Sequence, residues 1–162
     1  MSVLEQRFGA VGRKGSLGED WMFKKLQSNF IVSDYRKDYV MQTQGIDFGI
    51  KKPEWHREFT LDVKTNLYLP DADWYGFKLE LESDNKAGWF FTSKADRIYH
   101  VNSYLGKYLY YDLNMMRYYV TKKLINNDMK DLEIKNINGD ILLQIIIPKG
   151  LAHNIPVSQL FS

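Results

Sequence analysis

Hydrophobic and polar residues alternate along two short segments in the first half of the chain. The later one, residues 59–64, reads Phe-Thr-Leu-Asp-Val-Lys. Because successive side chains of a β-strand point to opposite faces, Asp62 and Lys64 are expected on one face and the apolar side chains on the other. The earlier one, residues 46–50, predicts a second strand with Asp47 on the face opposite its apolar side chains. Those apolar side chains are expected to be buried together: Ile46, Phe48 and Ile50.

These two strands predict a candidate metal site if they lie next to each other. Asp47, Asp62 and Lys64 then converge on one patch. Two neighbouring carboxylates suit Mg²⁺ or Mn²⁺, which prefer oxygen ligands and keep water molecules that a phosphate or a nucleophile can replace. The pattern is therefore the outline of a metal-dependent phosphodiesterase site.

A third carboxylate, Glu19, is expected on the inward face of a helix. Glu19, Met22, Phe23 and Leu26 follow the i, i+3, i+4, i+7 spacing of one helical stripe. The helix is expected to start at Ser16 as N-cap, so that Ser16 and Glu19 could form a capping box. We favour a site carboxylate at Glu19, a role that can coexist with capping.

The rest of the chain predicts alternating elements without a linker or a repeat. Strands are expected over 30–33, 75–82, 97–102 and 107–112, with a hairpin connection over 51–57. A helix over 113–126 and a closing hairpin of 131–135 and 141–147 around Asn138-Gly139 are expected to follow. With 162 residues, of which 44% are hydrophobic, the chain can bury one core, and we expect a single domain, 1–162.

Three motifs in this order resemble the PD-(D/E)xK nuclease superfamily over about the first eighty residues. They are the helix with Glu19, the strand with Gly45-Ile46-Asp47 and the strand with Asp62-Val63-Lys64. The leading proline of the family is absent, since Ile46 precedes Asp47. The resemblance implies an α/β restriction-endonuclease-like core, which is a mixed central β-sheet flanked by helices, with residues 74–82 as the next strand of that sheet.

The resemblance implies a Mg²⁺- or Mn²⁺-dependent DNA endonuclease, a phosphodiester hydrolase. Asp47 and Asp62 would bind the metal, together with Glu19 directly or through water and the backbone carbonyl of Val63. Lys64 would orient the attacking water or offset charge in the transition state. Glu80 and Glu82 share one face of a predicted strand, where one of them could be an extra ligand or both could be edge-strand charges.

The basic, glycine-rich segment Gly12-Arg13-Lys14-Gly15-Ser16 is similar to that of the archaeal and viral Holliday-junction resolvases within the superfamily. This similarity implies branched DNA of recombination and repair as the substrate, and a homodimer that brings two sites to one junction. The alternatives are a restriction-type, viral or repair nuclease, and a nucleic-acid-binding module without catalysis. Candidate phosphate contacts, each of which could equally be an ordinary solvated charge, are Arg13, Lys14, Lys51, Lys52 and Arg57.

The composition gives more information about where the protein is found than about its activity. The net charge of +2 is too small to indicate nucleic-acid binding by itself. The chain has no cysteine, no signal-peptide pattern and no apolar run near the ~20 residues of a membrane span. We therefore expect a cytoplasmic protein without a membrane partner, and a virus-encoded protein is an open alternative. Two further tripeptides have the same D/E-x-K form as Asp62-Val63-Lys64, namely Asp128-Met129-Lys130 and Glu133-Ile134-Lys135. In the second, Leu132 and Ile134 are expected to be buried by strand alternation.

Overall fold

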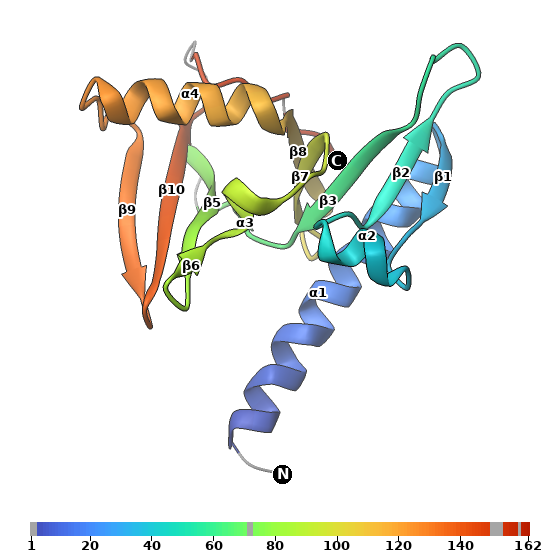
Figure 1. The fold of residues 1–162 in the computed structure, drawn as a ribbon, viewed down its shortest axis with the longest axis horizontal. Coiled ribbons are helices and arrows are strands. Elements are labelled where there is room, and N and C mark those ends of the chain that lie inside the picture. The colour runs from blue at the N-terminus through green and yellow to red at the C-terminus, as the bar shows by residue number, and fades with distance from the viewer. Residues whose placement is uncertain (1–2, 71–72, 150–153, 159) are drawn as a thin grey trace.

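Two β-sheets form the body of the molecule, with the long first helix running below them (Figure 1). The computed structural model describes residues 3–70, 73–149, 154–158 and 160–162, with side chains described from Gly15 onward. The fold is mixed α/β, with a mixed multi-strand sheet flanked by helices. Within the described residues, no helix has both the length and the apolar character needed to cross a membrane.

The first sheet has the strand order β1-β2-β3-β7-β8. Its strands are β1 (Ile31–Asp34), β2 (Phe48–Lys51), β3 (Phe59–Lys64), β7 (Arg97–Asn102) and β8 (Lys107–Asp112). All neighbouring pairs are antiparallel except β3 and β7, which run parallel. A parallel pair needs a long crossover connection, and here the chain between β3 and β7 builds part of the second sheet. The five strands of this sheet that the sequence predicted are confirmed, as is the hairpin that joins β2 to β3.

The second sheet is antiparallel, with the order β4-β5-β10-β9 and a short β6 paired to β5. Its strands are β4 (Leu67–Tyr68), β5 (Trp74–Ser83), β6 (Lys86–Ala87), β9 (Leu132–Ile137) and β10 (Asp140–Pro148). The β9–β10 hairpin is confirmed, and its turn residues Asn138 and Gly139 both have positive φ, at 52° and 89°. The placement of residues 74–82 in the first sheet is wrong, because β7 occupies the position beside β3 and β5 pairs with β10 instead.

Helix α1 (Val3–Gln27) packs its last turns on the first sheet. Met22 and Leu26 are buried there against residues of β2, β3 and β7. The prediction of an N-cap at Ser16 is wrong, since the helix starts thirteen positions earlier (16 − 3) and Ser16 lies inside it. No proline interrupts residues 3–27, so the packed turns can nucleate a helix that propagates through the glycine-rich segment despite the low helix propensity of glycine. Figure 1 shows the first turns of α1 extending beyond both sheets.

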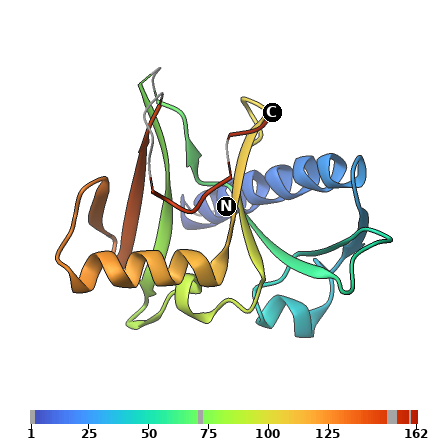
Figure 2. The ribbon, with the colours of Figure 1, turned by 90° about the horizontal axis from the view of Figure 1, so that it is seen from above.

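Three shorter helices complete the fold: α2 (Tyr39–Thr43), α3 (Trp89–Thr92) and α4 (Leu113–Ile125). Figure 2 shows α2 and α3 on the side of the first sheet opposite α1. The predicted helix over 113–126 is confirmed. It packs on the second sheet through Leu113, Met116 and Val120, and Asp112 caps it by accepting a hydrogen bond from the Met115 backbone N–H at 2.9 Å.

The buried side chains form two clusters, and the position of Ile46 corrects one expectation. Phe48 and Ile50 pack under α1, whereas Ile46 belongs to the larger cluster shared with the second sheet and α4. Strand alternation starts only at Phe48, where β2 begins. Ile46 follows Gly45, whose φ of +69° turns the chain before the strand. The prediction that Ile46 shares a face with Phe48 and Ile50 is therefore wrong.

Gly18 allows α1 to approach the end of β3 very closely. A Cβ atom at Gly18 would lie 2.2 Å from Cγ2 of Thr65, the residue that follows Lys64. Any larger residue would push the helix away from the strand, and Glu19 would move with it. The absence of a side chain at Gly18 therefore helps to place Glu19 beside the end of β3.

The first prediction tests this contact. We expect Gly18→Ala to lower the free energy of unfolding by about 1–2 kcal/mol, because an overpacking cost of about 1–3 kcal/mol exceeds the gain of up to about 1 kcal/mol in helix propensity. Thr65→Ser removes the clashing methyl group and should restore most of the loss in the double variant. Urea denaturation monitored by tryptophan fluorescence measures both effects.

Gly15→Ala is the matched control, since a Cβ there would meet nothing within 4 Å. Helix propensity alone should then leave the protein unchanged or up to about 1 kcal/mol more stable. A double variant no more stable than Gly18→Ala would contradict the proposed contact.

Candidate functional site

The two predicted aspartates lie next to each other at the junction of β2 and β3. Asp47 directly precedes β2 and Asp62 lies in β3, and they are 7% and 4% exposed. The backbone N–H of Asp47 donates to the Leu61 carbonyl at 2.8 Å. Asp47 Oδ2 accepts a hydrogen bond of 2.9 Å from the Val63 backbone N–H. The side chain of Asp47 thus reaches across to the strand that carries Asp62 and Lys64.

Lys64 forms a close ion pair with Asp62. Its Nζ lies 3.0 Å from Asp62 Oδ2, but the angles do not make a hydrogen bond, so this buried oxygen has no hydrogen-bond donor. Burial raises the pKa of Asp62 to about 7; Lys64 counteracts this rise and Asp47 adds to it. The site therefore holds a carboxyl group that is destabilised as an anion despite its lysine neighbour.

Glu19 approaches the same patch from α1. Burial raises its pKa to about 7, and the negative charge of Asp47 raises it further, while Arg36 and Lys64 lower it. These charges act on Glu19 because the helix and the strand ends are close together. The structure therefore places Asp47, Asp62 and Lys64 together, with Glu19 within electrostatic range of Asp47 and Lys64.

Gln42 is a site neighbour that sequence reasoning missed. From α2, its Nε2 donates to the Ile46 carbonyl at 2.7 Å and lies 3.3 Å from Asp47 Oδ1. Both oxygens of Asp47 thus have a donor within the protein. A single glutamine in a polar segment carries no pattern that would mark it as a partner of a carboxylate.

Arg36 was also missed and lies beside Glu19. Its guanidinium pairs with Asp20 at 2.6 Å and with Asp34 at 2.8 Å, and it stacks 5.0 Å from the ring centre of Phe48. These contacts hold the loop after β1 against α1. Arg36 therefore joins the helix to the strand region at the edge of the candidate site.

Trp89 of α3 covers the ammonium group of Lys64, whose Nζ lies 4.9 Å from the centre of the indole ring. The backbone N–H of Trp89 in turn donates to Glu80 Oε1 at 3.2 Å. The Glu80 side chain thus holds the start of α3 in place and is not a free metal ligand. Glu82 lies further along β5, paired with Ala87 and Ile141.

A buried polar network lies directly behind Lys64. His100 of β7 is paired in register with Lys64; its Nδ1 contacts Asn66 Oδ1 and its Nε2 lies 2.7 Å from the Tyr111 hydroxyl. Burial keeps the pKa of His100 well below its ordinary value, so the ring is neutral. Because Asn66 Nδ2 donates to the Lys78 carbonyl at 2.8 Å, its oxygen faces the ring. His100 therefore donates from Nδ1 and accepts from Tyr111 at Nε2.

The predicted phosphate contacts have different surroundings. Lys51 is exposed, and Nζ of Lys52 lies 5.3 Å from the ring centre of Phe30. Arg57 pairs with Asp96 at 2.8 Å, so this side chain already has a structural role. The side chains of Arg13 and Lys14 lie outside the part of the chain whose side chains are described.

The similar tripeptide in β9 has a different environment. Glu133 and Lys135 are 3.9 Å apart, and Glu133 is exposed. The prediction that Ile134 is buried is wrong, since 54% of it is exposed. The reason is that β9 is the edge strand of its sheet, paired only with β10 in the described structure. The other tripeptide lies in the turn after α4, where Asp128 pairs with Lys123 at 3.2 Å.

The carboxylates of the candidate site provide the oxygen donors that Mg²⁺ or Mn²⁺ prefers. Asp62 Oδ2 is buried without a hydrogen-bond donor, and burial, with a smaller contribution from the negative charge of Asp47, raises the pKa values of Asp62 and Glu19. In the described part of the chain, no three His, Cys, Asp or Glu side chains are already close enough together to enclose an ion. The donor set fits these metals, with Asp47 and Asp62 as the central pair.

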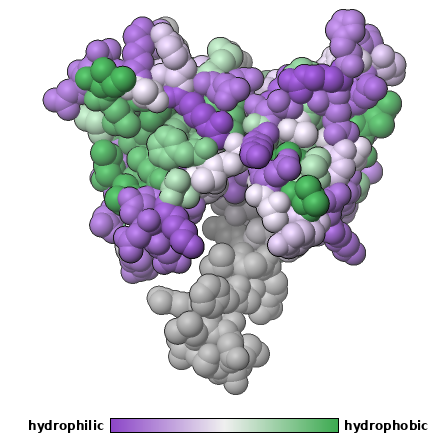
Figure 3. Space-filling view, in the orientation of Figure 1, coloured by the Kyte–Doolittle hydropathy of each residue, from purple (hydrophilic) through white to green (hydrophobic). Residues whose placement is uncertain are grey.

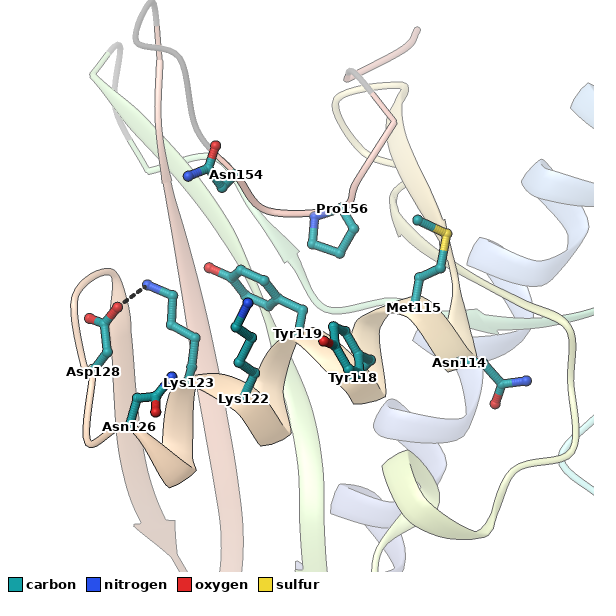
Figure 4. A pocket seen from close by; sticks show the side chains of 10 residues that line it. All are labelled: Asn114, Met115, Tyr118, Tyr119, Lys122, Lys123, Asn126, Asp128, Asn154 and Pro156. Carbon is teal, nitrogen blue, oxygen red and sulfur yellow. Dashed lines mark ion pairs between the residues drawn. The ribbon is translucent and has the colours of Figure 1, made fainter.

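A cavity of about 660 Å³ lies elsewhere, along α4 (Figure 4). Its walls are the outer side of α4, the following turn and residues 154–156. None of the four candidate site residues lines it. The chemistry predicted from the sequence therefore belongs to the strand junction and not to this cavity.

Comparisons with protein-family models, curated proteins and solved structures found no match to this chain.

The second prediction concerns pH and stability in a metal-free buffer. A carboxyl group whose pKa is raised by folding binds its proton more tightly in the folded state. The protonated group stabilises the folded state fully at pH values below its pKa in the unfolded chain, which is about 4. This stabilisation is lost as the pH rises through its folded-state pKa of about 7. Asp62 and Glu19 should therefore lower the melting temperature as the pH increases from about 5 to about 8, with each kcal/mol corresponding to about 2–4 °C at this chain length.

Asp62→Asn removes one of the two titrating groups, so it should flatten this pH dependence and raise the melting temperature at pH ~8. Glu133→Gln is the matched control, because Glu133 is an exposed carboxylate of a similar tripeptide, and it should leave the profile unchanged. Differential scanning fluorimetry across the pH series measures the effect. An Asp62→Asn profile parallel to that of the unmodified protein would show that Asp62 titrates normally.

Proposed function

We propose that this protein is a Mg²⁺- or Mn²⁺-dependent DNA endonuclease of the PD-(D/E)xK type. The observation that carries the proposal is the buried pair Asp47 and Asp62 on adjoining strands, with Lys64 3.0 Å from Asp62. Buried carboxylates are costly unless a partner neutralises them. Lys64 alone leaves the pKa of Asp62 at about 7. A binding site for a divalent cation explains why the chain keeps this arrangement.

The order of elements supports the same proposal. A helix that carries Glu19 is followed by the antiparallel strands β1, β2 and β3, and then by β7 parallel to β3. The helix with Glu19 and the segments with Asp47 and Asp62 follow the order expected from the resemblance, but the strand beside β3 is β7 and not the expected residues 74–82. The restriction-endonuclease-like core is part of what we propose.

Each residue of the candidate site has its own role in the proposed reaction. Asp47 and Asp62 would hold the metal, with Glu19 as a direct ligand or through water and the Val63 carbonyl as a backbone ligand. A metal held there would supply an activated water and neutralise charge on the phosphate. The Lys64 ammonium, lying between Asp62 and the face of Trp89, is positioned to donate to the attacking water or to a phosphate oxygen.

Branched DNA is the substrate that we propose, with a homodimer as the cutting unit. One site cuts one strand, so cleavage of both arms of a junction needs two protomers. The exposed Lys51 lies at the end of the catalytic strand β2 and is available for a phosphate contact. A restriction-type enzyme would instead need side chains that read base edges in a groove.

The third prediction separates catalysis from binding. Lys64→Ala should reduce cleavage at least ~100-fold, because it removes a charge placed at the reacting phosphate. DNA affinity should change little, since one lysine accounts for a small part of the total phosphate contact. Cleavage is measured with Mg²⁺ or Mn²⁺ on single-stranded, duplex, flap and four-way-junction DNA, and affinity by fluorescence anisotropy.

Lys135→Ala, the corresponding lysine of the β9 tripeptide, is the matched control and should cut at the normal rate. Excess chelator should abolish activity. Robust cleavage in chelator, or full activity of Lys64→Ala, would reject the proposed site. Equal cleavage of junction and duplex DNA would reject only the preference for branched DNA.

A further inference from the structure

The segment from Arg36 to Gln42 is attached to the candidate site at both ends. At one end, Arg36 pairs with Asp20 of α1 at 2.6 Å and lowers the pKa of the neighbouring Glu19. At the other end, Gln42 Nε2 lies 3.3 Å from Asp47 Oδ1. These two contacts join both ends of the segment to the candidate site.

Tyr39 lies at the middle of this segment and points into solvent. It is 82% exposed, and its neighbour Val40 is 60% exposed. Helix α2 buries none of its residues, so the fold does not use these side chains for packing. Figure 3 shows an isolated hydrophobic spot over α2, surrounded by polar surface.

Helix geometry directs Tyr39 toward the site. Residues three positions apart lie on the same side of a helix, with Cβ atoms about 5–6 Å apart. Tyr39 and Gln42 have this spacing, and Gln42 contacts Asp47. Tyr39 therefore lies on the side of α2 from which Gln42 reaches Asp47.

Cations on the segment that carries Tyr39 and in the candidate site fit a nucleic acid better than an apolar partner, while the adjacent Asp38 accepts a hydrogen bond from the Met41 backbone N–H. Lys37 is exposed two residues before Tyr39, and Lys64 lies at the centre of the patch. Cations beside an aromatic face are the combination with which proteins hold single-stranded nucleic acid, where lysines follow the phosphates and aromatic rings stack on the bases. A protein partner would be expected to need a larger continuous apolar surface.

We propose that Tyr39 stacks on an unpaired nucleobase next to the scissile phosphate. The inference rests on the proposed nuclease function and specifies its substrate class. In continuous duplex DNA the faces of the bases are covered by their neighbours, so Tyr39 has nothing to stack on. A branch point, a gap or a single strand exposes a base face. Tyr39 thus selects DNA with an unpaired base at the cleavage position.

The experiment uses two DNAs of the same sequence, a continuous duplex and a duplex with one unpaired 2-aminopurine. Binding is measured with Ca²⁺ in place of Mg²⁺, from anisotropy and from the quenching of 2-aminopurine that accompanies stacking. The unmodified protein and Tyr39→Phe should quench the unpaired base. Tyr39→Ala should lose the quenching and about tenfold in affinity for that DNA, while its affinity for the continuous duplex should stay within about twofold.

Tyr118→Ala is the matched control, since Tyr118 is 71% exposed but lies on α4, and it should behave like the unmodified protein. Unchanged binding and quenching in Tyr39→Ala would overturn the inference and would assign the exposed surface to a contact other than DNA. An equal loss on both DNAs would also overturn it, because Tyr39 would then be a general contact. Quenching that depends on Tyr39 in a protein that cuts no DNA with Mg²⁺ would reject the nuclease function while supporting the base-stacking site.

Discussion

The burial of two neighbouring carboxylates is the constraint around which the first sheet is organised. Asp47 tolerates burial because the Val63 backbone and Gln42 offer donors to its two oxygens. Asp62 forms an ion pair with Lys64, and its Oδ2 lacks a hydrogen-bond donor. Stability is therefore lower here than an apolar strand junction would give, as is common where a protein preserves a functional site. The contacts of α1, α2 and α3 all converge on this point.

The central part of the site could be predicted from the sequence because it depends on the alternation of side chains along single strands. Alternation in β3 places Asp62 and Lys64 on one face, and the short hairpin brings Asp47 beside them. The partner of β5 could not be predicted in this way, because sheet membership depends on pairing with β10, far along the chain. Gln42 was missed for the same reason, since its role exists only after α2 has packed beside Asp47.

The two lysine tripeptides in strands show why a motif alone does not define a site. Asp62-Val63-Lys64 and Glu133-Ile134-Lys135 both occur in strands, and both contain an ion pair between their first and third residues. The first pair is close and buried because β3 has a strand on each side, whereas the second lies on an edge strand. Depth within a sheet changes the electrostatics of two tripeptides that share the same pattern of acidic residue, apolar residue and lysine.

The parallel pairing of β3 with β7 has a consequence for the order of folding. Strands β1 to β3 are joined by short connections, so Asp47, Asp62 and Lys64 can meet through local contacts. Pairing of β7 with β3 requires residues 65–96 to form a much longer loop. This pairing is slower because the entropic cost of closing the loop comes before the contacts between the strands form. The charged cluster would thus assemble in water, and its desolvation would come as a late step, when the crossover brings α3 and Trp89 over Lys64.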